Sequence, residues 1–84
     1  MKVQDIKRKI IIEFGIKVRK KRKELSLSEE ELAWRANISD RELRNIEHGK
    51  VNPKLDSVIS LCVQLSIDIG ELALIYPVEA IEYV

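Results

Sequence analysis

Residues 28–49 read Ser-Glu-Glu-Glu-Leu-Ala-Trp-Arg-Ala-Asn-Ile-Ser-Asp-Arg-Glu-Leu-Arg-Asn-Ile-Glu-His-Gly, and the chain is organised around this stretch. It holds two short helical patterns, predicted over 29–36 and 40–48. Ser28 and Ser39 precede them, and each serine is followed three residues later by a glutamate, which is the pattern of a capping box. The serine oxygen would accept a hydrogen bond from the first turn, and the glutamate would reach back to the N–H of the cap. The stretch therefore predicts two capped helices in close succession.

The connector between the two patterns is Ala36-Asn37-Ile38, and asparagine tolerates the left-handed conformation that a tight turn needs. Gly49 is placed to end the second helix in the same conformation. A helix, a three-residue turn and a second helix form the layout of a helix-turn-helix unit, whose second helix can enter a DNA major groove. The apolar positions that would face inward are Leu32, Ala33, Ala36, Leu43 and Ile46.

The length of 84 residues predicts one small domain, and the helical patterns predict an all-α fold. No stretch approaches the ~20 apolar residues of a membrane span, and charged residues interrupt any signal-peptide core near the start. The single cysteine, Cys62, cannot form an internal disulfide, so we expect a cytoplasmic protein with no membrane partner. On the apolar pattern of its helix, Cys62 is expected to be a small buried residue.

Charge is segregated along the chain, although the net charge is only +1. Residues 1–25 hold ten Lys or Arg against three acidic residues, whereas 26–50 hold four against six and 51–84 hold one against five. This distribution is expected if one face meets an anionic partner. A lysine-rich helix that merely solvates its outer face explains it equally well.

An arginine interrupts the apolar face of the helix predicted over 14–25. Phe14, Val18, Arg22 and Leu25 share that face at helical spacing. A half-buried guanidinium needs a carboxylate partner. Glu47, next to the inward face of the second unit helix, is the obvious partner.

Residues 1–13 are interpreted as an N-terminal extension of this first helix, although the β-branched run at 10–12 fits an extended segment as well. A basic arm on DNA, a dimer contact and a frayed or packed end all remain open, and the last is favoured. Residues 14–75 are assigned to the domain, and 76–84 to a tail that packs on the domain or pairs with a second subunit.

A fourth helix is predicted over 55–65, after the helix-stopping Pro53. Asp68 and Glu71 form a third cap-like pair that opens a fifth helix, predicted to run through Leu72 and Ile75. The fourth helix is expected to be largely core because its apolar residues form a helical stripe, namely Leu55, Val58, Ile59, Cys62 and Leu65.

Trp34 lies off the apolar face of its helix, and two interpretations remain open for it. It either is a half-exposed residue that covers its neighbours, which is favoured, or contacts a partner or the DNA backbone. An enzyme is rejected on the sequence, because one histidine, one cysteine and no glycine-rich phosphate loop leave nothing to build a reaction on. No cofactor and no metal site are expected.

The stretch Phe14–Ile75 resembles the Cro/C1-type helix-turn-helix family, which includes lambda-type phage repressors, Cro proteins, xenobiotic-response-element-type regulators and restriction–modification controller proteins. The motifs occur in family order and spacing. They are Phe14-Gly15, Arg22, Leu27-Ser28-x-Glu30-Glu31-Leu32-Ala33, Ile38-Ser39, Ile46-Glu47-x-Gly49, Asn52-Pro53-x-Leu55 and Asp68-x-x-Glu71-Leu72.

The resemblance implies a compact five-helix, lambda-repressor-like domain that binds double-stranded operator DNA, usually as a homodimer. It implies a structural ion pair between Arg22 and Glu47. It implies base reading by Ser39, Asp40, Arg41, Arg44 and Asn45. Phosphate contacts are implied or expected for His48, Gly49, Lys50, Asn52 and Lys54, with Lys20 and Lys21 on the first helix.

The sequence departs from the family pattern at several positions. Glu29 stands where glutamine is common, Asn37 where the turn glycine is common, and Ser26 and Ser66 where glycines usually precede helices. The two serines cost little if their φ angles are negative. The acidic run at 29–31 and the apolar tail keep open an alternative function, a protein-interaction module of the same fold with weak DNA affinity, such as an antitoxin-like or anti-repressor partner.

Overall fold

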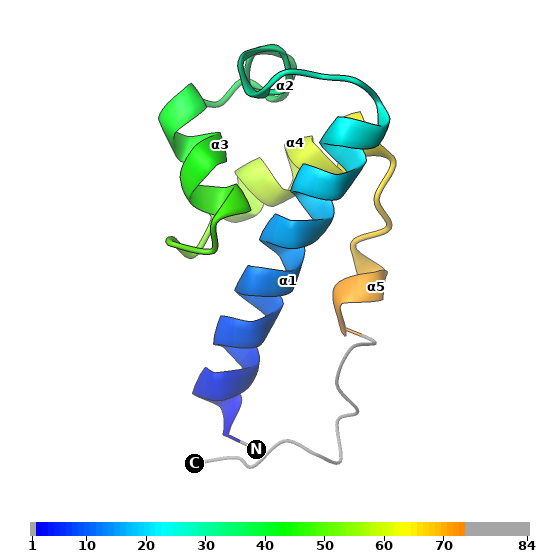
Figure 1. Ribbon diagram of the computed structural model, residues 1–84. Helices are drawn as coiled ribbons and strands as arrows, with labels where there is room; N and C mark the ends of the chain where they lie inside the picture. The colour runs from blue at the N-terminus through cyan, green and yellow to red at the C-terminus, as the bar shows by residue number, and fades with distance from the viewer. Residues whose placement is uncertain (1, 74–84) are drawn as a thin grey trace.

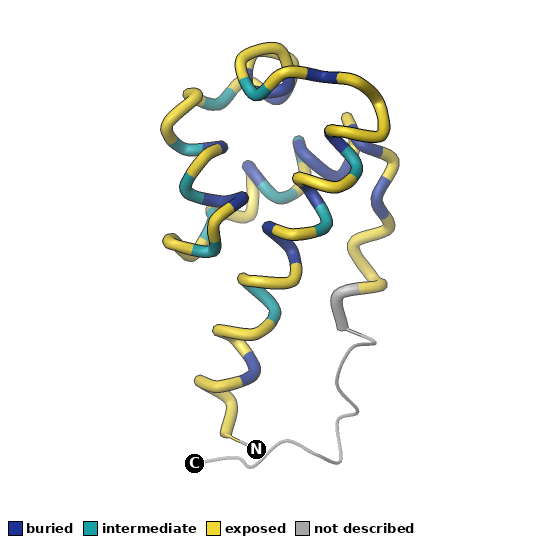
Figure 2. Tube along the Cα trace, in the orientation of Figure 1, coloured by how far each residue is buried: buried dark blue, intermediate teal, exposed yellow. Residues whose placement is uncertain are grey.

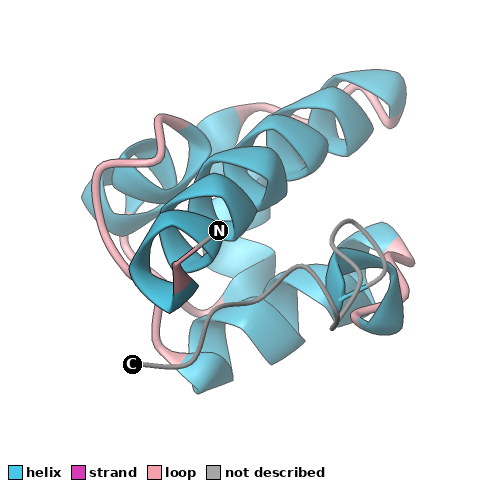
Figure 3. Ribbon diagram, turned by 90° about the horizontal axis from the view of Figure 1, so that it is seen from below, coloured by secondary structure: helices cyan, strands magenta, loops and turns pink. Residues whose placement is uncertain are grey.

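The computed structural model describes residues 2–73, and every element in this part of the chain is a helix (Figure 1). Short loops join the helices, as the view from below shows (Figure 3). The all-α prediction is therefore confirmed for the described residues. The elements are α1 (Val3–Glu24), α2 (Glu29–Ala36), α3 (Asp40–Glu47), α4 (Leu55–Leu65) and the single turn α5 (Gly70–Ala73).

Helix α1 is one continuous helix from Val3, so the β-branched run at 10–12 is helical rather than extended. Its C-terminal half packs against α3 and α4, whereas its first turns project away from them (Figures 1 and 2). Phe14 and Val18 are buried on the inner side, but Leu25 is 52% exposed because it lies at the very end of the helix. The predicted face is thus correct except at its last position.

The predicted serine caps are present at both helices of the central unit. The hydroxyl of Ser28 accepts a 3.0 Å hydrogen bond from the N–H of Glu31, and Ser39 accepts one of the same length from Glu42. The reciprocal half of each capping box is replaced by other contacts. The Glu31 carboxylate lies near Arg35, and a Glu42 oxygen accepts a 2.5 Å hydrogen bond from Ser57 on α4. Glu42 therefore joins α3 to α4.

Four helices end in the same way, with one residue in the left-handed conformation: Ser26 (φ 57°), Asn37 (φ 58°), Gly49 (φ 65°) and Ser66 (φ 54°). At each end the next N–H bonds back to a carbonyl five residues earlier, as in a Schellman motif. The prediction for the asparagine and the glycine is confirmed. The serines do not avoid positive φ, so the condition under which they would cost little fails.

The predicted stripe of α4 is partly wrong. Leu55 and Ile59 are 67% and 48% exposed, and the buried face runs instead through Ser57, Leu61, Cys62 and Leu65. Ser57 can face inward because its hydroxyl bonds to the carboxylate of Glu42. Cys62 is buried as predicted, and burial, reinforced by nearby Asp68, raises the pKa of its thiol.

Gly15 lets α1 approach α3 more closely than any other residue would. A Cβ placed at Gly15 would lie 2.2 Å from the carbonyl oxygen of Ile46 and 3.0 Å from that of Glu47. Those distances leave no room for a methyl group. The close approach brings Phe14 and Val18 into one core with Leu43 and Ile46 of α3.

The turn α5 begins differently from the prediction. An oxygen of Asp68 accepts a 2.9 Å hydrogen bond from the N–H of Gly70, and Glu71 forms an ion pair with Lys17 of α1 instead of completing a cap. The predicted continuation to Ile75 and the tail 76–84 lie outside the described residues. Among residues 2–73, no helix is long and apolar enough to cross a membrane.

Candidate nucleic-acid interface

The inner side of α3 is tied to α1 by a two-pronged ion pair. The Nε of Arg22 donates to Glu47 at 2.7 Å, and a second guanidinium nitrogen donates to the other carboxylate oxygen at 3.1 Å. The third donates to the carbonyl of Leu27 at 3.0 Å. Only 9% of Arg22 and 6% of Glu47 are exposed, and the hydrogen bond to Glu47 raises the pKa of the guanidinium. The pair therefore sets the position of α3 on α1.

The outer side of α3 carries polar side chains into solvent. Ser39, Asp40, Arg41 and Arg44 are exposed, and Asn45 is half-buried. Leu43 and Ile46 take the opposite side and are almost fully buried. Because the buried residues hold the helix in place, the exposed ones form a polar face on a firmly seated helix.

A groove runs between this face and the loop that follows α3. One wall is α3 with its cap, and the other is the loop that follows. The lining residues are Ser39, Arg41, Glu42, Asn45, Val51, Asn52, Pro53 and Lys54. The one acidic member, Glu42, accepts a hydrogen bond from Ser57 of α4. The fold thus brings together three of the predicted base-reading residues and two of the predicted phosphate-contacting residues. The donors on both walls suit an edge of nucleic acid, with base edges on one side and phosphates on the other.

Arg44 lies apart from that groove and faces α2. Its Nε is 3.9 Å from Oε2 of Glu29, an oxygen that is buried and accepts no hydrogen bond from residues 2–73. Among residues 2–73, Asp40 forms no ion pair with Arg41 or Arg44. The carboxylate nearest Arg44 is therefore Glu29. The sequence favours Asp40 as the group that orients Arg41 or Arg44, over a contact with cytosine N4, and that interpretation is wrong for the described residues.

At the end of α3, His48 and Lys50 are exposed and Gly49 between them is half-buried. Gly49 and Lys50 close the Schellman motif, with the N–H of Lys50 bonded to Asn45 at 2.9 Å. Nδ1 of His48 is 2.7 Å from the carbonyl oxygen of Arg44, which can only accept, so this nitrogen carries the proton. In the neutral ring the other nitrogen is then an acceptor.

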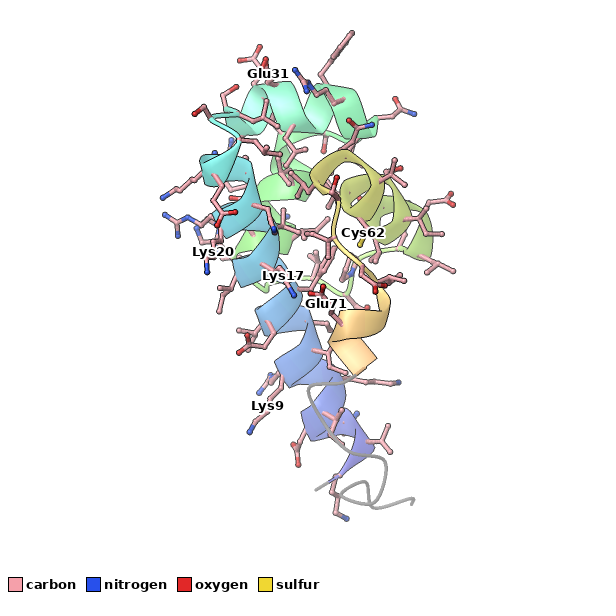
Figure 4. All side chains as sticks on the ribbon, turned by 90° about the vertical axis from the view of Figure 1, so that its right-hand side faces the viewer. Lys9, Lys17, Lys20, Glu31, Cys62 and Glu71 are labelled. Atoms are coloured by element: carbon pink, nitrogen blue, oxygen red, sulfur yellow. The ribbon has the colours of Figure 1, made fainter. Side chains whose placement is uncertain are left out.

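The two lysines predicted to hold phosphate from α1 are not brought to the groove by any described contact. Lys20 is exposed on the side of α1 (Figure 4), and Nζ of Lys21 lies 3.9 Å from Glu24 on the same helix. Among the described residues, no group of three or more His, Cys, Asp or Glu side chains could hold a metal ion.

Trp34 is 81% exposed, more than any other large hydrophobic side chain that the structure describes. The favoured interpretation, a half-exposed tryptophan covering its neighbours, is wrong. The side chain projects from the outer face of α2 because Leu32, Ala33 and Ala36 already fill the inner face.

The comparison with known protein families agrees with this geometry. A helix-turn-helix family model matches residues 18–72, most of the chain, and the match runs from the last third of α1 into α5. The chain belongs to the Cro/C1-type helix-turn-helix family of DNA-binding domains. Searches of curated proteins and of solved structures returned no match.

Proposed function

We propose that this protein is a sequence-specific DNA-binding transcriptional regulator that places α3 in the major groove. The observation that carries the proposal is the groove in which Ser39, Arg41 and Asn45 face Asn52 and Lys54. Base-reading and phosphate-holding groups face one another there on a helix that the Arg22–Glu47 pair holds in place.

The side chains of α3 suit direct reading of base edges. Arg41 can donate two hydrogen bonds to O6 and N7 of guanine, and Asn45 can pair with N6 and N7 of adenine. Ser39 begins the helix and is exposed beside them. Arg44 lies on the α2 side, outside the groove and 3.9 Å from Glu29, and would reach bases beyond those that Arg41 and Asn45 read. The carboxylate of Asp40 can only accept, for which the amino group at cytosine N4 is suited.

The groups around the end of α3 would hold the phosphate backbone without reading sequence. Lys50, Asn52 and Lys54 follow one another on the loop, and all three are exposed. His48, exposed at the end of α3, lies next to Lys50 in the chain. Lys20 and Lys21 would contribute a more distant attraction from α1.

We assign the homodimer contact to an apolar patch on the far side of α4. Ile59, Val63 and Ile69 are 48%, 68% and 45% exposed there, and they surround a hollow that reaches Cys62 and Ile67. A twofold dimer through this patch would present two copies of α3 to the two halves of a pseudo-palindrome, with centres about one DNA turn, roughly 34 Å, apart.

Val63→Glu should shift the protein toward monomer in sedimentation experiments and weaken binding to the two-half-site duplex.

The decisive experiment is a binding titration against the DNA upstream of the gene. Any inverted repeat found there is made as a labelled duplex, with a scrambled duplex of the same composition as control. Anisotropy is measured at about 50 and 200 mM salt, a range in which nonspecific contacts weaken strongly. A preference for the repeat that persists at the higher salt supports the proposal.

Two variants separate base reading from phosphate binding. Arg41→Ala should relax specificity at one base pair by ~1–3 kcal/mol, and Lys50→Ala should weaken every duplex and lower the salt slope by about one. Equal loss on all duplexes for Arg41→Ala would remove the base-reading role from that residue. No binding to any duplex at low salt would favour the alternative function, a protein-interaction module of the same fold.

A further inference from the structure

The outer face of α2 carries a feature that DNA reading does not use. Trp34, the single tryptophan of the chain, is 81% exposed on it. Tryptophan is highly buried on average, and its large ring dominates the energetics of interfaces when it is covered. So large an exposure on a helix whose inner face is well packed points to a surface that another molecule covers.

Acidic groups surround this ring. An open hollow beside the ring has two apolar lining residues, Trp34 and Ile38. Its polar lining residues are Ser28, Glu30, Glu31 and Asp40. Glu31 lies 3.7 Å from Arg35, but Glu30 and Asp40 form no ion pair within residues 2–73. The hollow therefore combines an aromatic face with two carboxylates that have no ion-pair partner among the described residues.

This combination is suited to one kind of group. A guanidinium or ammonium is attracted to the face of a tryptophan, and a carboxylate beside the ring adds a charge-assisted hydrogen bond. We propose that the surface formed by Glu30, Trp34, Ile38 and Asp40 binds a basic segment of a partner protein, with an arginine or lysine stacked on Trp34. Ile38 would contact an apolar neighbour of that cation.

The charges of the chain argue against its own segments as the occupant. The last eleven residues, 74–84, contain Glu79 and Glu82 and no lysine or arginine. The basic N-terminal half of α1 runs away from α2, so that Lys9 and Glu31 lie at opposite ends of the molecule (Figures 1 and 4).

Charge also argues against two intermolecular occupants. A second copy related by twofold symmetry would set one acidic rim against the other, and phosphates would be repelled by Glu30 and Asp40. A basic protein segment is the occupant that the rim attracts. Because Asp40 begins α3, such a partner would sit beside the DNA-reading helix, although its binding does not depend on DNA.

The test uses the full chain labelled with ¹⁵N and a short peptide of alternating arginine and leucine. A matched peptide carries citrulline, which keeps the shape of arginine but not its charge. The single indole N–H signal of Trp34 reports binding. The arginine peptide should move this signal together with the amides of Glu30 and Ile38, and the citrulline peptide should not.

Variants give the same test through a labelled peptide. Trp34→Ala and Glu30→Gln should each weaken the arginine peptide, the former by about 2- to 30-fold, which is the range of a cation–aromatic contact. Asp56→Asn, which removes an exposed carboxylate on α4, is the matched control and should leave binding unchanged. Circular dichroism should show all three variants folded.

Three results would overturn the proposal. The first is equal response to both peptides, or no response at millimolar concentration. The second is loss of binding to every DNA duplex in Trp34→Ala, which would place the ring on the phosphate backbone. The third is self-association that Trp34→Ala abolishes, which would make the surface a contact between copies of this chain.

Discussion

The two sides of α3 differ in almost every physical respect. On the inner side, the backbone of the helix touches Gly15 of α1, and the Glu47 carboxylate is enclosed with Arg22. On the outer side, Arg41 and Arg44 extend into solvent, and Arg44 has only a 3.9 Å contact to Glu29. A helix eight residues long is marginal alone, so the inner side must supply the stability that lets the outer side stay polar.

This difference predicts which property of the protein a substitution on each side of α3 should change. Changes on the inner side should alter the free energy of unfolding, whereas changes on the outer side should alter DNA binding and leave the free energy of unfolding nearly unchanged. Because Trp34 is exposed in the folded protein, its fluorescence is a poor reporter of unfolding, and circular dichroism is the appropriate measurement.

The largest effect is expected at Gly15. Alanine is the better helix former by about 1 kcal/mol, but its methyl group would collide with the carbonyl of Ile46, so Gly15→Ala should destabilise by about 3 kcal/mol or more. Thermal unfolding checks this. Gly70→Ala is the matched control, since the added methyl would meet only the flexible Asp68 side chain. Similar melting temperatures for the two variants would show that α1 and α3 can separate at little cost.

The next effect is expected at the enclosed ion pair. Glu47→Ala leaves the Arg22 guanidinium without its carboxylate and should destabilise by ~3–5 kcal/mol. Denaturant unfolding measures the change. Glu31→Ala, which breaks the exposed pair with Arg35, should cost about 0.5 kcal/mol or less. An unchanged stability in Glu47→Ala would mean that the pair contributes nothing to seating α3.

A smaller effect of opposite sign is expected at the end of α4. Ser66 is held at a φ of 54°, which glycine adopts without strain. Ser66→Gly should therefore stabilise by about 0.5–1 kcal/mol, or raise the melting temperature by roughly 2–8 °C. Ser60→Gly within the same helix should have the reverse sign, because there glycine only adds freedom to the unfolded chain. If both substitutions destabilised, left-handed strain at Ser66 would not be the controlling factor.

The smallest effect on stability is expected on the outer side. Arg41 is exposed and has no ion-pair partner within residues 2–73, so Arg41→Ala should change the unfolding free energy by no more than about 0.5 kcal/mol. The same protein sample should show the loss of base specificity described above. A large loss of stability in this variant would erase the contrast between the two sides of α3.

Local sequence signals predicted the central unit well. The serine caps, the Asn37 turn and the Gly49 end are set by short-range hydrogen bonds and by backbone conformation, and these depend on neighbours in the chain. The partner of Arg22 could also be predicted, because an arginine on an apolar face requires a carboxylate. The placement of the site residues in contact with DNA stays a prediction.

Other features could not be predicted because they depend on which elements meet. Ser57 faces inward because its hydroxyl donates to the Glu42 carboxylate, whereas a hydropathy pattern favours Leu55 and Ile59 for the buried face. The exposure of Trp34 follows from the packing of α2 by its small residues. The orientation of Arg44 by Glu29 needs two helices to be seated first.

By itself, the sequence determined α2, α3 and α4 and the caps and turns of the central unit, because capping, turn conformation and apolar periodicity act over a few residues. Its motifs, in their order and spacing, carried the resemblance to the family. Only the tertiary structure decided how closely α1 and α3 approach, which face of α4 is buried and which groups share the groove beside α3. Those outcomes depend on steric fit and on the pairing of buried charges between segments that are distant in the chain. Gly15 illustrates this division. Local sequence signals predict the helix in which it lies, whereas only the carbonyl of Ile46 explains why the position has no side chain.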